Sequence, residues 1–237
     1  MKDEEVKAAA IAFAKRNKNR IARELTDKTK YIPDTDPISV FMAGSPGAGK
    51  TEMSKIVISM LEYDERHVVR IDGDEIRPLL PGYVGNNSHL FQGAVSLIVE
   101  KMHDYALHQK QSFVLDGTFS RYEKAIDNIR RSHRKDRLVL VFYLYQKPEV
   151  AWKFTQAREK AEGRNIPKSA FIDQFLEARE TVDRVSKELK EKTQIFLVKE
   201  DFETNRVENI MRIGDKGSQI DDYILERYTQ SDLEKLL

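Results

Sequence analysis

One eight-residue segment limits the possible folds of this chain more than any other part of its sequence. It follows the mostly apolar run Ile38–Ala43, which is typical of a buried strand. It precedes a stretch whose apolar residues recur at helical intervals, at Met53, Ile56, Val57, Met60 and Leu61. The segment fits the pattern G-x-x-x-x-G-K-[ST] and consists of Gly44, Ser45, Pro46, Gly47, Ala48, Gly49, Lys50 and Thr51. A glycine-rich turn between a strand and a helix predicts a phosphate-binding loop.

The chemical groups of this turn suit the phosphates of a nucleotide. Its backbone N–H groups would point inward, and the N-terminus of the following helix adds positive potential. The Lys50 ammonium group would reach the β- and γ-phosphates, and the Thr51 hydroxyl would ligate Mg²⁺. A glycine-rich loop that arose by chance and binds no ligand would not need a strand before it and a helix after it. We therefore expect the chain to bind a nucleoside triphosphate together with Mg²⁺.

Downstream of this turn, strand-like apolar runs alternate with helical stretches. With the first strand included, the expected strands cover residues 38–43, 67–71, 112–115, 137–145 and 194–198. The expected helices lie around residues 52–62, 88–108, 121–132, 148–163 and 168–190. This alternation predicts an α/β protein of the P-loop NTPase fold, with a five-stranded, mostly parallel sheet and helices on both faces. Ligands of such sheets bind at the carboxyl ends of the strands, so functional residues are expected there.

A turn-rich break separates an N-terminal helix from this α/β unit. Residues 4–25 have amphipathic helical spacing, and Pro33 and Pro37 flank a short loop before the first strand. We expect a helical appendage over residues 1–36, the α/β domain over 37–205 and a C-terminal helical segment over 206–237. The N-terminal helix either packs as an appendage or forms a surface that docks a partner or covers the active site.

The overall composition excludes several other classes of protein. The 237 residues include no cysteine, which excludes disulfides. Their formal net charge of +1 provides no global electrostatic field that would attract nucleic acid. No apolar run reaches the roughly 18 residues of a membrane span, and the acidic start lacks the apolar core of a signal peptide. The basic run at 130–135 is expected to be a solvated loop. These features predict a cytoplasmic protein and argue against membrane or nucleic acid as a partner.

Two carboxylates, Asp72 and Asp74, follow the second expected strand. A phosphoryl transferase needs a group that orients and deprotonates the attacking hydroxyl near the γ-phosphate. Alternate residues of a strand face the same side, so both carboxylates can face the site. We expect Asp74 to be the base, and Asp72 to have a structural, metal-facing or substrate-facing role.

The third expected strand also ends in an acid, Asp116. In nucleotide sites a carboxylate at this position holds Mg²⁺ or one of its waters. Gly117 would let a substrate approach the backbone, and Thr118 offers a hydroxyl to a phosphate or a sugar. Glu100 lies on the long helix before this strand, and its residue type alone is more typical of a surface position.

Arg158 and Arg164 flank the end of a charged helix, close to the helix-ending residues Gly163 and Pro167. Guanidinium groups on a closing segment can meet the charge that develops on a transferring phosphoryl group. A charged helix surface with ordinary ion pairs would have a similar sequence. In a chain with a phosphate-binding loop, we favour a lid that brings both arginines to the γ-phosphate.

Residues 38–200 together resemble the zeta toxin kinases of bacterial toxin–antitoxin systems. The resemblance rests on the phosphate loop Gly44–Thr51, Ile71–Asp74, Glu100, Asp116–Thr118, and Arg158 with Arg164. It implies transfer of the γ-phosphate of ATP or GTP to the 3′-hydroxyl group of the amino sugar in UDP-N-acetylglucosamine, which would starve cell-wall synthesis. It further implies catalytic roles for Lys50, Asp74, Arg158 and Arg164, and sugar-nucleotide binding by Glu100 and Thr118.

The sequence departs from the family pattern at one position of the substrate site. The pattern has an arginine two residues after the threonine, where this chain has Ser120; Arg121 follows, and we assign it to substrate binding, with Asp72. Family members are inhibited by a helical antitoxin, so residues 4–25 are expected to dock such a partner or to inhibit within the chain. Two alternatives stay open. One is another P-loop kinase, acting on a polynucleotide end, a nucleoside or an antibiotic; the other is a non-enzymatic, nucleotide-dependent switch.

Overall fold

The structure is a computed structural model, and it describes residues 3–62, 67–163, 166–189, 192–201, 206–214 and 217–237. Its strands are β1 (Ile38–Ala43), β2 (Val69–Asp72), β3 (Phe113–Asp116), β4 (Leu138–Tyr145), β5 (Thr193–Asp201) and β6 (Arg206–Ile213). Its helices are α1 (Asp3–Leu25), α2 (Lys50–Leu61), α3 (Gly73–Ile76), α4 (Ser88–His108), α5 (Tyr122–His133), α6 (Pro148–Glu162), α7 (Lys168–Glu188) and α8 (Gln230–Leu236). Two short 3₁₀ turns, η1 (Arg77–Leu79) and η3 (Ile220–Asp222), complete the elements discussed below.

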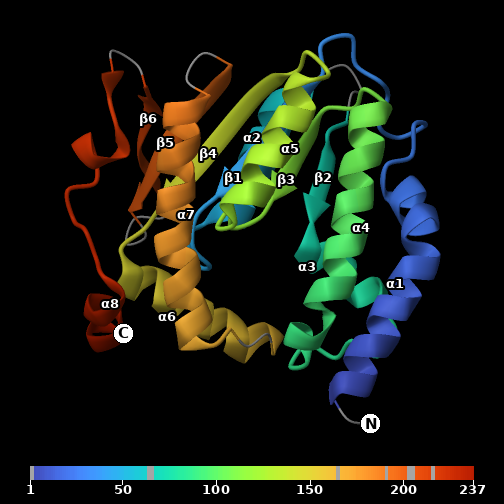
Figure 1. Cartoon of the computed structure of the whole chain (residues 1–237), viewed down its shortest axis with the longest axis horizontal. Helices are drawn as coiled ribbons and strands as arrows, with labels where there is room; N and C mark the ends of the chain where they lie inside the picture. The colour runs from blue at the N-terminus through green and yellow to red at the C-terminus, as the bar shows by residue number, and fades with distance from the viewer. Residues whose placement is uncertain (1–2, 63–66, 164–165, 190–191, 202–205, 215–216) are drawn as a thin grey trace.

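The strands form one sheet in the order β2-β3-β1-β4-β5-β6 (Figure 1). Strands β1 to β5 pair in parallel, and β6 pairs with β5 in antiparallel orientation. The predicted α/β fold with a mostly parallel sheet is confirmed. Because β1, β2 and β3 are parallel, their carboxyl ends lie at the same end of the sheet, where the phosphate loop also begins.

The sheet has six strands, so the expectation of five strands was wrong. The sixth strand, Arg206–Ile213, lies where a helical segment was expected from residue 206 onward. It is an edge strand in which Val207 and Ile210 are exposed and Ile213 is buried. An edge strand of mixed polarity lacks the continuous apolar run by which the central parallel strands were recognised. Beyond it, residues Gln230–Leu236 form α8.

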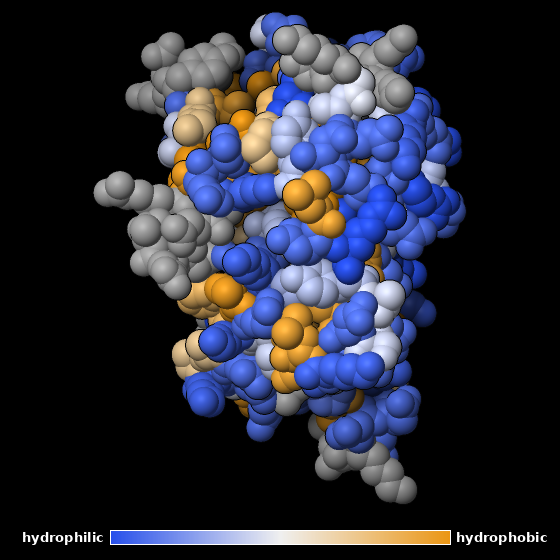
Figure 2. Space-filling model, turned by 90° about the vertical axis from the view of Figure 1, so that its left-hand side faces the viewer, coloured by the Kyte–Doolittle hydropathy of each residue, from blue (hydrophilic) through white to orange (hydrophobic). Residues whose placement is uncertain are grey.

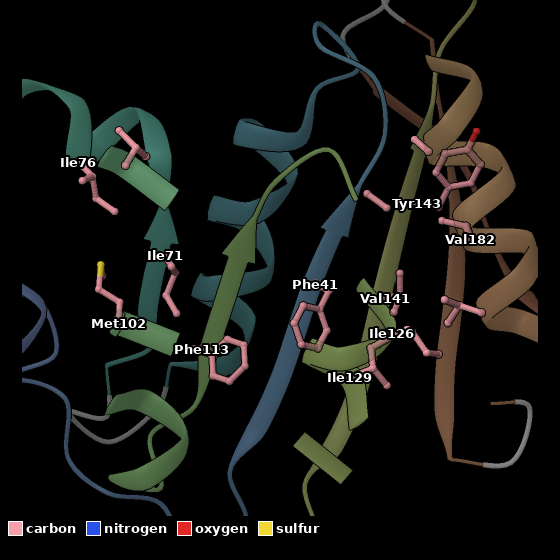
Figure 3. Packing of buried hydrophobic residues seen from close by; sticks show 14 of the residues in the cluster. Phe41, Ile71, Ile76, Met102, Phe113, Ile126, Ile129, Val141, Tyr143 and Val182 are labelled. Atoms are coloured by element: carbon pink, nitrogen blue, oxygen red, sulfur yellow. The ribbon is translucent and has the colours of Figure 1, made fainter. Parts of the chain in front are cut away.

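Helices cover both faces of the sheet, and each face has its own hydrophobic core. The core under α2 includes Val57 together with Val40 and Met42 of β1. The other core lies under α4, α5 and α7; Figure 3 labels ten of its members, Phe41, Ile71, Ile76, Met102, Phe113, Ile126, Ile129, Val141, Tyr143 and Val182. Because alternate strand residues face opposite sides, neighbouring residues of β1 enter different cores. The two cores fix the ends of the central strands, from which the functional residues extend.

Helix α1 packs against α4, which lies between α1 and the strands (Figure 1). A Cβ added at Gly93 of α4 would lie 3.4 Å from Ile11 Cδ1 of α1. The buried residues of α1 are mostly small, which permits this close approach; they are Ala10, Ala14, Ile21 and Ala22. The N-terminal helix is therefore packed onto the α/β unit.

The described surface is largely hydrophilic on the side that carries β6. Figure 2 shows this side, where hydrophobic residues form small, separate groups among hydrophilic ones. Among the described helices, none combines the length and the apolar character that crossing a membrane requires.

Candidate active site

The phosphate loop joins β1 to α2, as the sequence predicted. Gly44, Gly47 and Gly49 have φ angles of 138°, 72° and 80°, which residues with a side chain rarely adopt. Gly49 is the N-cap of α2, and no side chain of the described residues caps this helix. The Lys50 ammonium group donates to the backbone oxygens of Gly44 at 2.9 Å and Ser45 at 2.6 Å. A helix N-terminus without a side-chain cap, next to a lysine, fits the phosphates of a nucleotide.

An added methyl group at Gly47 is expected to disturb the contact of the phosphate loop with α6. An alanine Cβ there would lie 2.1 Å from the Ala151 backbone oxygen and 2.9 Å from Thr155 Oγ1. Gly47→Ala should therefore lower the free energy of unfolding by more than the roughly 1–3 kcal/mol of positive-φ strain alone. It should also weaken nucleotide binding. Denaturant unfolding and nucleotide titration measure the two effects.

Gly214→Ala is the matched control for this substitution. Its φ is 87°, but an added Cβ would have no described atom within 4 Å. The control should therefore lose only the backbone-strain contribution, and it should keep its nucleotide affinity. Equal losses of stability in the two variants would contradict a steric role for the contact with α6.

Strands β2 and β3 place two carboxylates side by side, because Asp72 and Asp116 are partners in the parallel register. One Arg70 nitrogen donates to Asp72 Oδ2 at 2.7 Å and to Asp116 Oδ2 at 2.9 Å. The Ser54 hydroxyl of α2 donates to the same Asp116 oxygen at 3.2 Å. This cluster connects the ends of β2 and β3 to the helix after the phosphate loop. Arg70 was not predicted from the sequence, although its spacing from Asp72 puts both side chains on one face of the strand.

Asp72 is 9% exposed, and its pKa is raised to about 6. Burial of the charged form is the largest cause, and the nearby charge of Asp116 adds to it. The backbone N–H of Asp74 donates to Asp72 Oδ1 at 2.8 Å, and this bond lowers the pKa, as does Arg70. The same bond makes Asp72 the N-cap of α3. Its contacts here are those of a structural residue.

Asp74 lies in α3, and its two carboxylate oxygens contact different arginines. Oδ1 accepts a hydrogen bond from Arg77, and Oδ2 accepts one from Arg158 of α6 at 3.4 Å. Arg77 also donates to Gln92 Oε1 of α4 at 2.8 Å. The site therefore combines side chains from separate helices. Asp74 and Arg158 were predicted from the sequence. Arg77 and Gln92 were not, although the i, i+3 spacing of Asp74 and Arg77 was a signal.

Helix α6 runs toward the start of α4 at the end of the molecule where β2 gives way to α3 (Figure 1). Gly163 ends α6 with a φ of 70°, and a Cβ added there would lie 3.6 Å from the Asn86 backbone nitrogen. The structure thus places the end of the predicted lid beside the loop before α4. Arg158 contacts the site from within α6. Arg164 lies outside the described residues, so its role stays a prediction.

The loop after β3 lies beside the phosphate loop. The Gly44 N–H donates to the Thr118 backbone oxygen at 3.1 Å. The Thr118 and Ser120 hydroxyls are 3.0 Å apart, and Thr181 of α7 donates to the Ser120 backbone oxygen at 3.0 Å. Arg121 is the exposed N-cap residue of α5. Thr118 is therefore next to the phosphate loop, whereas Arg121 stands at the start of the following helix.

Glu100 belongs to an ion-pair network between α4 and α5. Its carboxylate accepts hydrogen bonds from Lys124 and, at 2.8 Å, from Arg131. Arg131 also pairs with Asp104, one helical turn after Glu100. The structure thus shows Glu100 bound to cationic residues of α5, and its role in substrate binding stays a prediction.

Thr51 and Asp116 are the residues that could hold Mg²⁺. Across the residues that the structure describes, no three or more His, Asp or Glu side chains form a metal site by themselves. Mg²⁺ at nucleotide sites keeps several waters and takes one or two carboxylates together with phosphate oxygens. A single carboxylate next to α2, with a hydroxyl at the start of that helix, fits such a donor set.

A family model described as zeta toxin matches residues 21–217 of this chain. A search of curated proteins found no match. The match to the family model spans the phosphate loop, both carboxylate-bearing strands and α6.

Solved structures with the same fold include one from a toxin–antitoxin system. One comes from the PezAT chromosomal toxin–antitoxin system of Streptococcus pneumoniae, with 18% identity, a TM-score of 0.67, and coverage of 94% of this chain and 91% of that chain. A chain of the AvrRxo1-ORF1:-ORF2 structure with ATP has 14% identity and a TM-score of 0.59, over 93% of this chain and 69% of that one. A chain of the Pnkp1/Rnl/Hen1 RNA repair complex has 19% identity and a TM-score of 0.51, over 65% and 47%. At these identities the likeness shows the shared fold.

Proposed function

The chain belongs to the zeta toxin family, and from this premise we propose that it is a kinase that transfers the γ-phosphate of a nucleoside triphosphate to a hydroxyl group. The observation that carries the proposal is the position of Asp74. Contacts through Asp72, Arg70 and Asp116 connect it to α2, the helix that starts at the phosphate loop. A carboxylate in that neighbourhood is what transfer to a hydroxyl needs, whereas nucleotide binding alone would not require it.

Each residue of the proposed site has a task in the transfer. The phosphate loop and Lys50 would bind the triphosphate, and Thr51 and Asp116 would hold Mg²⁺, which when bound neutralises charge on the β- and γ-phosphate oxygens. Asp74 would orient the acceptor hydroxyl and take its proton while the hydroxyl oxygen bonds to the γ-phosphorus. The bond between that phosphorus and the β–γ bridging oxygen breaks, and a nucleoside diphosphate leaves.

Arg158 is proposed to change partner during this reaction. Its contact with Asp74 is 3.4 Å long, and its side chain is 41% exposed, so the ion pair is weak. A phosphoryl group with developing charge is a stronger partner for a guanidinium group than one carboxylate oxygen. Moving Arg158 to the phosphate would remove this contact from Asp74 Oδ2.

We propose a nucleotide sugar, such as UDP-N-acetylglucosamine, as the acceptor. This proposal follows Thr118, which matches the family pattern and lies beside the phosphate loop. It also uses Arg121, which stands at the start of α5, one residue after the position where the pattern has an arginine. The additional substrate contacts proposed are those of Asp72 and Glu100. Ser120, in place of the arginine of the family pattern, is the position at which this acceptor site differs.

We also propose an antitoxin protein as a partner, because the PezAT structure is described as part of a toxin–antitoxin system. Helix α1 offers an exposed basic surface for such a partner, made of Lys15, Arg16, Arg20 and Arg23. Since α1 also buries residues against α4, removing residues 1–30 would damage the core. Substitutions on its exposed side are therefore the better test of docking.

A transfer assay with γ-labelled ATP and Mg²⁺ tests the proposed acceptor. The panel contains UDP-N-acetylglucosamine, other nucleotide sugars, a nucleoside, an aminoglycoside and an oligonucleotide with a 5′-hydroxyl end. We expect label on UDP-N-acetylglucosamine, and none when Lys50→Ala replaces the wild type. Label on another acceptor would replace the nucleotide sugar in the proposal. Nucleotide binding without transfer to any acceptor would favour the non-enzymatic switch.

A further inference from the structure

Among the described residues, Arg77 and Arg158 contact Asp74, and they differ in how deeply they are buried. The Arg77 side chain is 7% exposed, whereas that of Arg158 is 41% exposed and that of Asp74 is 32% exposed. An ion pair with an exposed partner is weak and easily exchanged. A pair with a buried guanidinium is retained, because separating it would leave an unpaired charge out of water. Arg77 is therefore the lasting partner of Asp74, and Arg158 the exchangeable one.

Arg77 is itself fixed from a second helix. One guanidinium nitrogen donates to Asp74 Oδ1 in α3, and another donates to Gln92 Oε1 in α4 at 2.8 Å. Its Nε is buried and has no hydrogen-bond partner within the described part of the chain. A planar guanidinium held at two of its nitrogens has little freedom to rotate. It therefore fixes the direction in which the Asp74 carboxylate points.

We propose that Arg77 is the positioning residue for Asp74. By binding Oδ1, it keeps Oδ2 directed toward Arg158 in the structure described here and toward the acceptor hydroxyl when the phosphate draws Arg158 away. The inference rests on the proposed kinase function and adds a residue to it. A displacement of the base by about 1 Å can lower the rate by about 10²-fold, so an orienting residue of this kind has a large effect on catalysis.

The test is a double-mutant cycle between Arg77 and Asp74. Arg77→Met keeps a similar side-chain length without the hydrogen bonds, and Arg77→Lys restores the charge without the planar fork. We expect Arg77→Met to lower kcat for transfer by about 10²-fold with the KM for ATP unchanged, and Arg77→Lys to recover part of the loss. In an Asp74→Asn background, Arg77→Met should change kcat by less than about threefold, because the residue acts through the base.

Arg179→Met is the matched control. The Arg179 side chain is 17% exposed and donates to Asp221 at 2.6 Å, on the side of the protein that carries η3. Its loss should lower the melting temperature and leave kcat unchanged. The positioning role is overturned if Arg77→Met lowers only the melting temperature and leaves kcat unchanged. It is also overturned if Arg77→Met lowers kcat by the same factor in the wild-type and the Asp74→Asn backgrounds. The kinase proposal stands in both cases. A wild-type protein that phosphorylates no acceptor overturns both, since the positioning role presupposes the transfer.

Discussion

Replacing Asp74 by asparagine is expected to lower kcat for phosphoryl transfer by about 10²- to 10⁴-fold, the usual contribution of a general base. Asparagine keeps the size of the side chain and a hydrogen-bonding oxygen, but it cannot take a proton from the acceptor hydroxyl. Its oxygen can still accept a bond from Arg77, so the local structure should persist. The KM for ATP should stay near that of the wild type, because Asp74 does not belong to the phosphate loop. Single-turnover transfer with labelled ATP measures the effect.

Asp183→Asn is the control for the Asp74 substitution. Asp183 lies on α7 and pairs with Lys187 at 2.6 Å, four residues later. This variant removes the same charge from an exposed helical ion pair and should transfer phosphate at the rate of the wild type. If Asp74→Asn also keeps its rate, Asp74 is not the base. A third outcome is that neither the wild type nor Asp74→Asn shows any transfer, while Asp74→Asn keeps nucleotide binding and the biological effect of the wild type. In that case the chain acts as a nucleotide-dependent switch.

Arg158→Met is expected to lower kcat by about 10³- to 10⁵-fold, the range observed for an arginine that stabilises a transferring phosphoryl group. The substitution removes the donors that the proposed lid would bring to the developing charge, and it leaves the phosphate-loop residues unchanged. Arg158→Lys should recover only part of the rate, because an ammonium group cannot donate in the bidentate geometry of a guanidinium. Steady-state kinetics should show the loss in kcat, with a smaller change in the KM for ATP.

Arg20→Met is the matched control for the Arg158 substitution. Arg20→Met removes an exposed arginine of α1 that pairs with Glu24 at 2.8 Å, and it should leave kcat unchanged. If Arg158→Met is faster than the wild type, the ion pair with Asp74 restrains the base and the arginine does not serve the phosphate. A normal rate would exclude both roles for Arg158.

The sequence predicted those parts of the fold that depend on contiguous residues. The glycine positions, the lysine and the apolar run before them identified the strand, the turn and the helix, and the structure has β1, the loop and α2 in that order. The missed strand, Arg206–Ile213, has little apolar pattern of its own, and its structure depends on pairing with β5. Pairing with a neighbouring strand is a tertiary interaction, which local propensity does not reveal.

In the candidate site, too, some residues could be predicted from the sequence, whereas their contacts depend on tertiary packing. Asp72, Asp74 and Asp116 could be selected because residues at strand ends share one end of a parallel sheet. Their arginine partners could not be selected from the sequence, since a carboxylate does not specify which arginine it will contact in the folded chain. Glu100 illustrates the limit, because its network with Lys124 and Arg131 depends on how α4 and α5 pack together.

The sequence alone determined the phosphate-binding turn, the alternation of strands and helices, and the residue types available for chemistry. These properties are local, since they follow from the φ angles that glycine permits and from the hydrophobic period of each element. Only the tertiary structure decided that β3 lies between β2 and β1, so that Arg70 bridges Asp72 and Asp116. It also decided that Asp74 lies between a buried and an exposed arginine. Burial and charge pairing depend on packing between distant segments, and that packing determines which of these arginines is buried and which is exposed.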